Sequence, residues 1–145
     1  MSSQKRKGDT FERELATYFN ETADISTAYR APLSGGGKVS SHGGADLIGV
    51  PDLFVEAKRV ERLNFMDAIR QAERNSQETN SPETPIVINR RNRMTTEDSI
   101  CFLRLKDFMK YYNAYLKLTG RQKSKTSVNS ESNWMNKEKT YGNIN

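Results

Sequence analysis

The hydrophobic residues between positions 9 and 19 repeat with the period of an α-helix. They follow one another at intervals of three and four residues, which places them on one face of a helix. These residues are Phe11, Leu15, Tyr18 and Phe19. Asp9 or Thr10 can cap the beginning of this helix.

Further along, short apolar runs alternate with two more helical patterns. A helix is expected over residues 65–77, with Asn64 as its cap, and another over 105–118, whose aromatic stripe is expected to be buried in the core. Strands are expected at 25–32, 45–49, 52–60, 84–90 and 98–105, and the second and third of them form a hairpin that turns at Val50–Pro51.

The order of these elements, helix, three strands, helix, two strands, helix, predicts an α+β protein. Helices would flank a small mixed sheet. After residue 119 the composition becomes polar and loses any period. We therefore expect one folded domain over residues 1–119 and a disordered tail over 120–145.

Charge and composition narrow the class of protein. The chain of 145 residues has a formal net charge of +5 and a single cysteine, Cys101. It contains no long apolar run, and its first residues are charged, so we expect neither a membrane span nor a signal peptide, and a reducing, cytoplasmic setting. Residues 120–145 hold five Lys/Arg and two acids, which gives +3 to the tail and leaves +2 for the rest.

Three short basic clusters could nevertheless form a nucleic-acid interface if the fold brings them to one face. They are Lys5–Arg6–Lys7, Lys58–Arg59 with Arg62, and Arg90–Arg91 with Arg93. Lys38 lies in a Gly/Ser-rich loop, residues 34–44, that is either mobile or wraps a ligand.

Charged residues interrupt the apolar strand "LFVEAK", residues 53–58. Because side chains alternate along a strand, Glu56 and Lys58 lie on one face, about 7 Å apart. An exposed edge strand would explain this pair without any function. The expected hairpin brings Asp46 roughly opposite them, whereas Asp52 is assigned to the turn itself.

A third acid can join them from the first helix. Glu12 lies beside the apolar stripe, at about 100° from Phe11 when each residue adds about 100°. A capping role three residues after Asp9 competes equally with a role in the site. If Glu12, Asp46 and Glu56 do converge, a divalent cation relieves their repulsion, and their oxygen ligands suit Mg²⁺, or Mn²⁺ in its place. Such a metal beside a lysine fits hydrolysis of phosphodiester bonds.

This arrangement of residues resembles the PD-(D/E)xK nuclease superfamily and, more closely, the archaeal-type Holliday junction resolvases. The similarity is carried by "KRKGDTFERELA" at 5–16, "YRAPLSG" at 29–35 and "ADLIG…LFVEAK" at 45–58, with a shorter match, "RQAE", at 70–73. The resemblance implies a restriction-endonuclease-like core and a homodimer that acts on branched double-stranded DNA.

The resemblance also implies roles for individual residues. Glu12, Asp46 and Glu56 would be metal ligands, and Lys58 the catalytic lysine. Arg30 and Ser34 would assist the scissile phosphate, while Arg6 and Lys7 would hold the DNA backbone. Gln71 would join the DNA-binding residues, although a solvent-exposed glutamine is the more ordinary interpretation.

Three functions are open at this point. The first is a Mg²⁺-dependent endonuclease that resolves four-way (Holliday) junctions. The second is another endonuclease of the same superfamily, of restriction or repair type, which would need base-reading elements for which a small body has little room. The third is a DNA-binding module without catalysis, against which the clustered carboxylates argue because they would repel phosphate.

Overall fold

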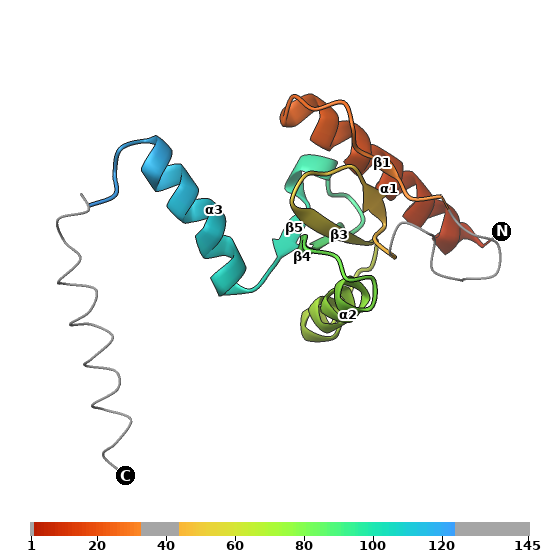
Figure 1. Cartoon of the computed structure of the whole chain (residues 1–145). Coiled ribbons are helices and arrows are strands. Elements are labelled where there is room, and N and C mark those ends of the chain that lie inside the picture. Colours follow the sequence, from red (N-terminus) through yellow and green to blue (C-terminus); the bar gives the residue numbers. More distant parts are fainter. Residues whose placement is uncertain (1, 33–43, 124–145) are drawn as a thin grey trace, which may run out of the picture. The chain divides into compact units, whose positions relative to one another are not determined.

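The computed structural model describes residues 2–32 and 44–123. It is α+β, with the expected order of helices and strands and one added 3-10 turn. The elements are α1 (Ser3–Thr22), β1 (Tyr29–Arg30), β2 (Leu47–Ile48), β3 (Leu53–Lys58), α2 (Phe65–Glu78), β4 (Thr84–Asn89), η1 (Thr96–Asp98), β5 (Ile100–Phe102) and α3 (Leu105–Leu118) (Figure 1). The expected strands at 25–32, 45–49 and 98–105 are thus much shorter than predicted.

The chain divides into two compact units, Met1–Arg104 and Leu105–Asn145. The expected domain boundary after residue 119 stays a prediction. Most of the proposed tail, residues 124–145, lies outside the described residues.

The main sheet of the first unit is mixed, as predicted. β3 pairs in parallel with β4, and β4 pairs antiparallel with β5. β1 and β2 form a separate antiparallel pair. The backbone N–H of Asp46 donates to the carbonyl of Val55 over 2.9 Å, which joins this pair to the free edge of β3. The prediction is thus met only in part: the turn is present, but β2 pairs with β1 and is linked to β3 through this backbone hydrogen bond and not through a strand ladder.

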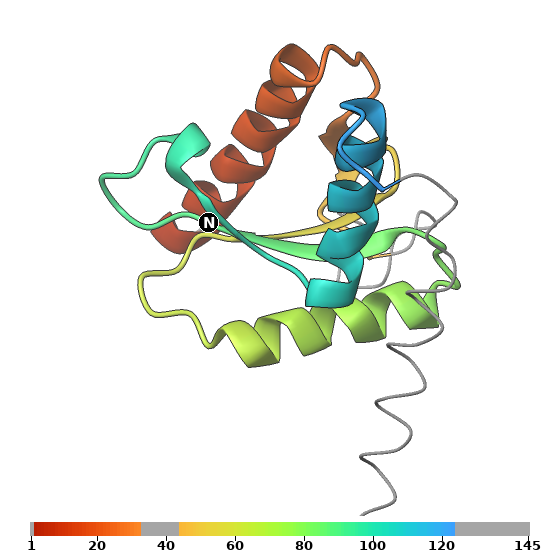
Figure 2. The same ribbon diagram turned by 90° about the vertical axis from the view of Figure 1, so that its left-hand side faces the viewer.

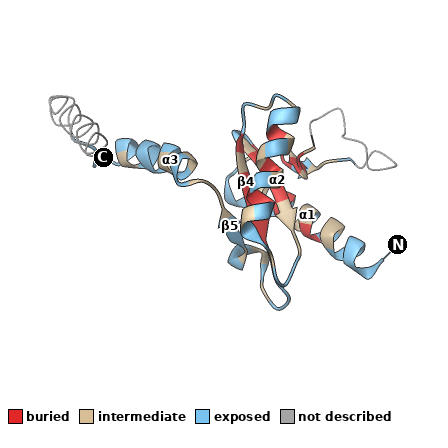
Figure 3. Ribbon diagram, turned by 90° about the horizontal axis from the view of Figure 1, so that it is seen from below, coloured by how far each residue is buried: buried red, intermediate tan, exposed pale blue. Residues whose placement is uncertain are grey.

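Two helices cover the two faces of the sheet (Figure 2). On one face Val55, Ile86 and Ile88 pack with Phe11 and Leu15 of α1. On the other face Val87 packs with the small apolar residues of α2, which are Ala68, Ile69 and Ala72. The buried residues follow these inner faces (Figure 3).

The turn between β2 and β3 depends on two residues with positive φ. Asp52 has a φ of 64°, which confirms its expected place in the turn. Gly49 has a φ of 76°, and a Cβ added there would lie 1.9 Å from the carbonyl oxygen of Thr27. Only glycine allows the two backbones to approach this closely. Gly49 thereby holds the β2–β3 turn, and with it Asp46, against the segment that precedes β1.

The structure corrects the beginning of the first helix. α1 begins at Ser3, where the Ser2 hydroxyl accepts from the N–H of Lys5 over 3.2 Å, and not at Asp9. The first turns of α1 bury no apolar residue, so the hydrophobic pattern could not reveal them. Because Asp9 lies inside the helix, the competing role of Glu12 in a capping box is wrong.

The structure also corrects the expectation for the third helix. The bounds of α3 are as predicted, but none of its residues is buried. The large side chains of its stripe, Phe108, Tyr112 and Tyr115, are between 42% and 50% exposed. The amphipathic pattern was interpreted correctly as a helix, but α3 belongs to the second compact unit, in which no described residue is buried.

Candidate nuclease site and basic pocket

Asp46 is held at the free edge of β3. It precedes β2, and its Oδ2 accepts from the backbone N–H of Ala57 over 2.7 Å. That peptide lies between Glu56 and Lys58 in the sequence. The hydrogen bond therefore places the Asp46 carboxylate beside both charged residues of β3, as the hairpin predicted.

Glu56 and Lys58 share the face of β3 that is covered by α2. In the parallel register Glu56 is opposite Val87, whose side chain packs against α2. Glu56 is only 5% exposed. Its Oε1 lies 3.3 Å from Nζ of Lys58, whereas its Oε2 is buried and has no hydrogen-bond partner among the described residues. Lys58 also donates to Oε1 of Gln71, in α2, over 2.9 Å.

Glu12 reaches the same region from α1. Its side chain is 17% exposed, and its Oε2 accepts from Nε of Arg30 over 2.7 Å. A terminal nitrogen of Arg30 also donates to Oδ1 of Asp9 over 2.7 Å. Arg30, which was expected to assist the scissile phosphate, is thus paired with two carboxylates in this structure.

Burial and neighbouring carboxylates raise the pKa of each of the three acids. Burial raises the pKa of Asp46 to about 8, the negative charge of Glu56 adds to this increase, and Glu12 contributes further. Burial likewise raises the pKa of Glu56, and Glu12 adds to it, while Lys58 opposes the change. Burial also raises the pKa of Glu12 against the effect of Arg30. Glu12 is therefore close enough to influence both Asp46 and Glu56 electrostatically, whereas the expected meeting of all three acids around one ion stays a prediction.

These residues fit a hard divalent cation in their chemistry. Three carboxylates supply oxygen ligands, and the buried Oε2 of Glu56 needs a partner. Within residues 2–32 and 44–123, however, no three acid, histidine or cysteine side chains already lie close enough together to form a metal site. Glu12, Asp46 and Glu56 would have to draw together around the ion.

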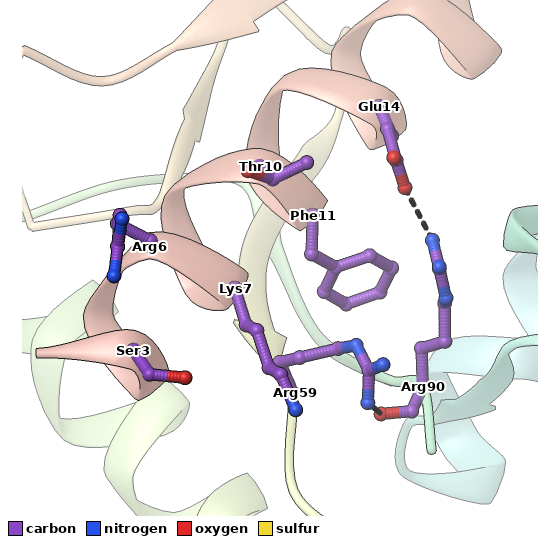
Figure 4. Close-up of a pocket in the computed structure, with 8 residues that line it drawn as sticks. All are labelled: Ser3, Arg6, Lys7, Thr10, Phe11, Glu14, Arg59 and Arg90. Carbon is purple, nitrogen blue, oxygen red and sulfur yellow. Dashed lines mark hydrogen bonds and ion pairs between the residues drawn. The ribbon is translucent and has the colours of Figure 1, made fainter. Parts of the chain in front are cut away.

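The three basic clusters each contribute to one pocket. The pocket, of about 310 Å³, lies between α1 and the segments that follow β3 and β4 (Figure 4). Its lining residues are Ser3, Arg6, Lys7, Thr10, Phe11, Glu14, Arg59 and Arg90. The clusters were expected to form an interface only if the fold brings them to one face. The pocket brings together two residues of the first cluster and one residue of each of the other two.

Other predicted residues lie elsewhere. Lys5, Arg62, Arg91 and Arg93 are exposed but do not line the pocket. Ser34 and Lys38 fall outside the described residues. Gln71 is half-buried and bonded to Lys58, so the interpretation as a solvent-exposed glutamine is wrong.

The sequence analysis missed two residues that hold the site in place. Asp9, interpreted as a helix cap, binds Arg30. The buried Asn89, at the end of β4, donates through its side-chain amide to the carbonyls of Lys58 and Val60, each over 3.0 Å. Asn89 could have been noticed because it is a polar residue at the end of the apolar strand "TPIVIN". The sequence does not show, however, that its side chain binds the segment after β3.

No described helix has both the length and the apolar character that a membrane crossing requires. Comparisons with models of protein families, with curated proteins and with solved structures gave no match.

Proposed function

We propose that this protein is a Mg²⁺-dependent DNA endonuclease with a restriction-endonuclease-like core, and that it resolves four-way junctions. One observation carries the proposal: the carboxylate of Asp46 is held beside the buried Glu56 and the amine of Lys58, and Glu12 of α1 is close enough to raise the pKa of both acids. Acids are seldom buried so close together unless a cation or a reaction uses them. The resemblance to the junction resolvases supplies the junction as substrate.

Each residue has a distinct part in the proposed reaction. Asp46, Glu56 and Glu12 would hold the ion, which when bound would lower the pKa of a water and screen phosphate charge. Lys58 stabilises the negative charge that develops on the phosphate, and Gln71 fixes the direction of its amine. The hydrogen bond from the Ala57 N–H keeps the Asp46 carboxylate in place when it loses its proton.

The basic pocket supports a nucleic-acid substrate. Four cations and one carboxylate line it, and contacts of this kind bind the phosphate backbone without reading sequence. Branched double-stranded DNA in the cytoplasm of a prokaryotic cell or a phage-infected host fits this proposal. The homodimer that the resemblance implies is part of the same proposal.

A DNA-binding module without catalysis is the second candidate. The observation that favours it is the pairing of Glu12 with Arg30, which already neutralises one proposed ligand. Glu12 keeps a second carboxylate oxygen, Oε1, so the pairing does not prevent it from binding a cation. An endonuclease of restriction or repair type would show itself by a preference for particular flanking sequences.

The test is cleavage of a synthetic four-way junction beside a linear duplex of the same sequence, with Mg²⁺ and with EDTA. We expect Mg²⁺-dependent cutting of the junction alone. The double variant Asp46→Asn, Glu56→Gln should bind the junction and leave it intact. Wild-type protein that binds but never cuts any branched or linear DNA would favour the module, and equal cutting of both substrates would exclude junction selectivity.

A further inference from the structure

The basic pocket and the acidic site are built from neighbouring residues that point to opposite sides. Lys58, the last residue of β3, turns toward α2 and contacts Gln71. Arg59, the next residue, lines the pocket beside α1 together with Phe11. α1 makes the same division, since Glu12 belongs to the acidic site and Glu14 to the pocket. A strand of DNA in the acidic site would therefore pass close to the pocket.

The cations of the pocket come from separate parts of the chain and are held in different ways. Arg6 and Lys7 are exposed on α1. Arg59 donates to the carbonyl of Arg90 over 3.3 Å and to the side chain of Asn92 over 3.0 Å, which fixes the segments after β3 and β4 relative to each other. Arg90 lies over the ring of Phe11, 5.7 Å from its centroid.

The beginning of α1 favours an anion in the same place. Ser3, the first residue of α1, lines the pocket, and the first turn of the helix contains no acidic residue. A helix N-terminus carries partial positive charge and unpaired N–H groups. The helix N-terminus therefore supplements the four cationic side chains of the pocket, which would attract an anion without it.

Glu14 is the carboxylate that lines the pocket, and it is bound to Arg90 (Figure 4). Thr96 donates to the same oxygen of Glu14, Oε2, over 3.3 Å. The Nε of Arg90 has no hydrogen-bond partner among the described residues. Because that Nε is buried, Arg90 would meet an anion through its terminal nitrogens, one of which already binds Glu14 and donates to Thr96 over 3.2 Å.

We propose that this pocket binds a phosphate group of the DNA backbone other than the one that is cut, and that Glu14 takes the place of that phosphate in the free protein. The proposal depends on the part of the proposed function that makes DNA the substrate, and it does not depend on whether the protein cuts that DNA. On binding, the phosphate displaces the Glu14 carboxylate from Arg90, while Arg6 and Lys7 close from the side of α1. The pocket thereby sets where along the strand the acidic site meets the backbone.

The decisive variant is Glu14→Gln, compared with Glu21→Gln, which removes the same charge from the far end of α1. Binding of a fluorescent DNA duplex is measured in EDTA, so that cutting plays no part. We expect Glu14→Gln to tighten binding by about three- to fivefold, the scale of one partly exposed charge pair, and Glu21→Gln to change it less. Equal effects of the two variants would reduce the observation to net charge and overturn the proposal.

A second pair of variants keeps the proposal testable if Glu14→Gln does not fold. Arg6→Ala with Lys7→Ala removes two exposed cations of the pocket, and Arg70→Ala with Arg74→Ala removes two exposed cations of α2. The first pair should weaken binding more and should reduce its salt dependence by about two phosphate contacts. An equal loss in both pairs would contradict a defined pocket.

The source of the phosphate is tested by NMR of the arginine side chains. Duplex DNA should shift the Nε–H signals of Arg59 and Arg90 at concentrations where inorganic phosphate leaves them unchanged. If inorganic phosphate shifts them and DNA does not, the pocket serves a small anion and the proposal is wrong. If DNA shifts them and the protein cuts nothing, the pocket stands and the nuclease proposal fails.

Discussion

The acidic site and the basic pocket are built from neighbouring residues of the chain and use charge in opposite ways. In the acidic site like charges are buried together, and their pKa values are raised. In the pocket Arg59 and Arg90 are each paired with a carboxylate, and Arg6 is exposed. Burial of like charges stores free energy that a cation or a reaction can release, whereas a partly exposed basic surface mainly attracts its ligand.

The largest effect is expected for Lys58→Ala. If Lys58 acts on the reacting phosphate as proposed, loss of its amine should lower cutting of the junction by about 10²–10³-fold, the scale of removing one donor that stabilises transition-state charge. Binding in EDTA should stay nearly unchanged, because the pocket retains its four cations. Arg74→Ala, which removes an exposed cation of α2, is the control. Unchanged turnover of Lys58→Ala would refute its role.

The next largest effect is expected for Gly49→Ala. A Cβ at this residue would meet the Thr27 backbone at 1.9 Å and would also be strained by the positive φ. We expect a loss of about 2–5 kcal/mol in the free energy of unfolding, from about 1–2 for the left-handed conformation and about 1–3 for overpacking.

Gly8→Ala is the matched control for this substitution. Gly8 lies in α1, and its added Cβ would meet nothing within 4 Å. That variant should gain about 0.5–1 kcal/mol from helix propensity. Denaturation by urea measures the free energy of unfolding of both variants. If Gly49→Ala is as stable as the wild type, the β2–β3 turn can rearrange and the prediction is wrong.

The dependence of protein stability on pH should arise from the acidic site and not from the basic pocket. The pKa of Asp46 is raised in the folded protein, to about 8, so the folded state holds a proton that the unfolded state loses near pH 4. Without a metal, stability should therefore fall as pH rises from about 4 to about 8. A loss of only 1 kcal/mol lowers Tm by about 4–8 °C in a domain of this size.

Two measurements test this assignment. Asp46→Asn should flatten the fall in Tm over that pH range, while an acid-to-amide change in the pocket, Glu14→Gln, should not. Mg²⁺ should raise the Tm of the wild type more at a pH above about 8 than at about 5, because cations bind the deprotonated ligands. A Tm that Mg²⁺ leaves unchanged at every pH would argue against a metal at these acids.

The difference between the two regions also shows how far the sequence could predict the structure. The ends of α3 and the span of β4 were expected almost to the residue, because strong apolar patterns define them. Helix and strand periodicity together with the hairpin predicted that Asp46 lies beside Glu56 and that Glu12 lies near them, whereas their convergence on one ion stays a prediction. These are local properties, and they need only short stretches of chain.

What the sequence could not predict depends on long-range pairing. The parallel register of β3 and β4 aligns Lys58 with Asn89 and brings Arg59 against Arg90, each pair separated by 31 residues. The hydrophobic pattern assigns side chains to the faces of a strand, but it does not identify the partner strand. The basic clusters were visible in the sequence, but their assembly with Glu14 into one pocket was not.

The smallest effect is expected for Gln71→Met, and it decides between two roles. If Gln71 positions Lys58, loss of its hydrogen bond should lower kcat by about two- to tenfold, as expected for a bond worth about 0.5–1.5 kcal/mol, with KM and binding in EDTA unchanged. If Gln71 instead contacts DNA, as the resemblance implies, binding in EDTA should weaken and KM should rise. Gln77→Met, an exposed change in the same helix, is the control and should alter neither. A fall in kcat alone would assign Gln71 to the acidic site, whereas a rise in KM alone would extend the DNA-binding surface from the basic pocket to α2.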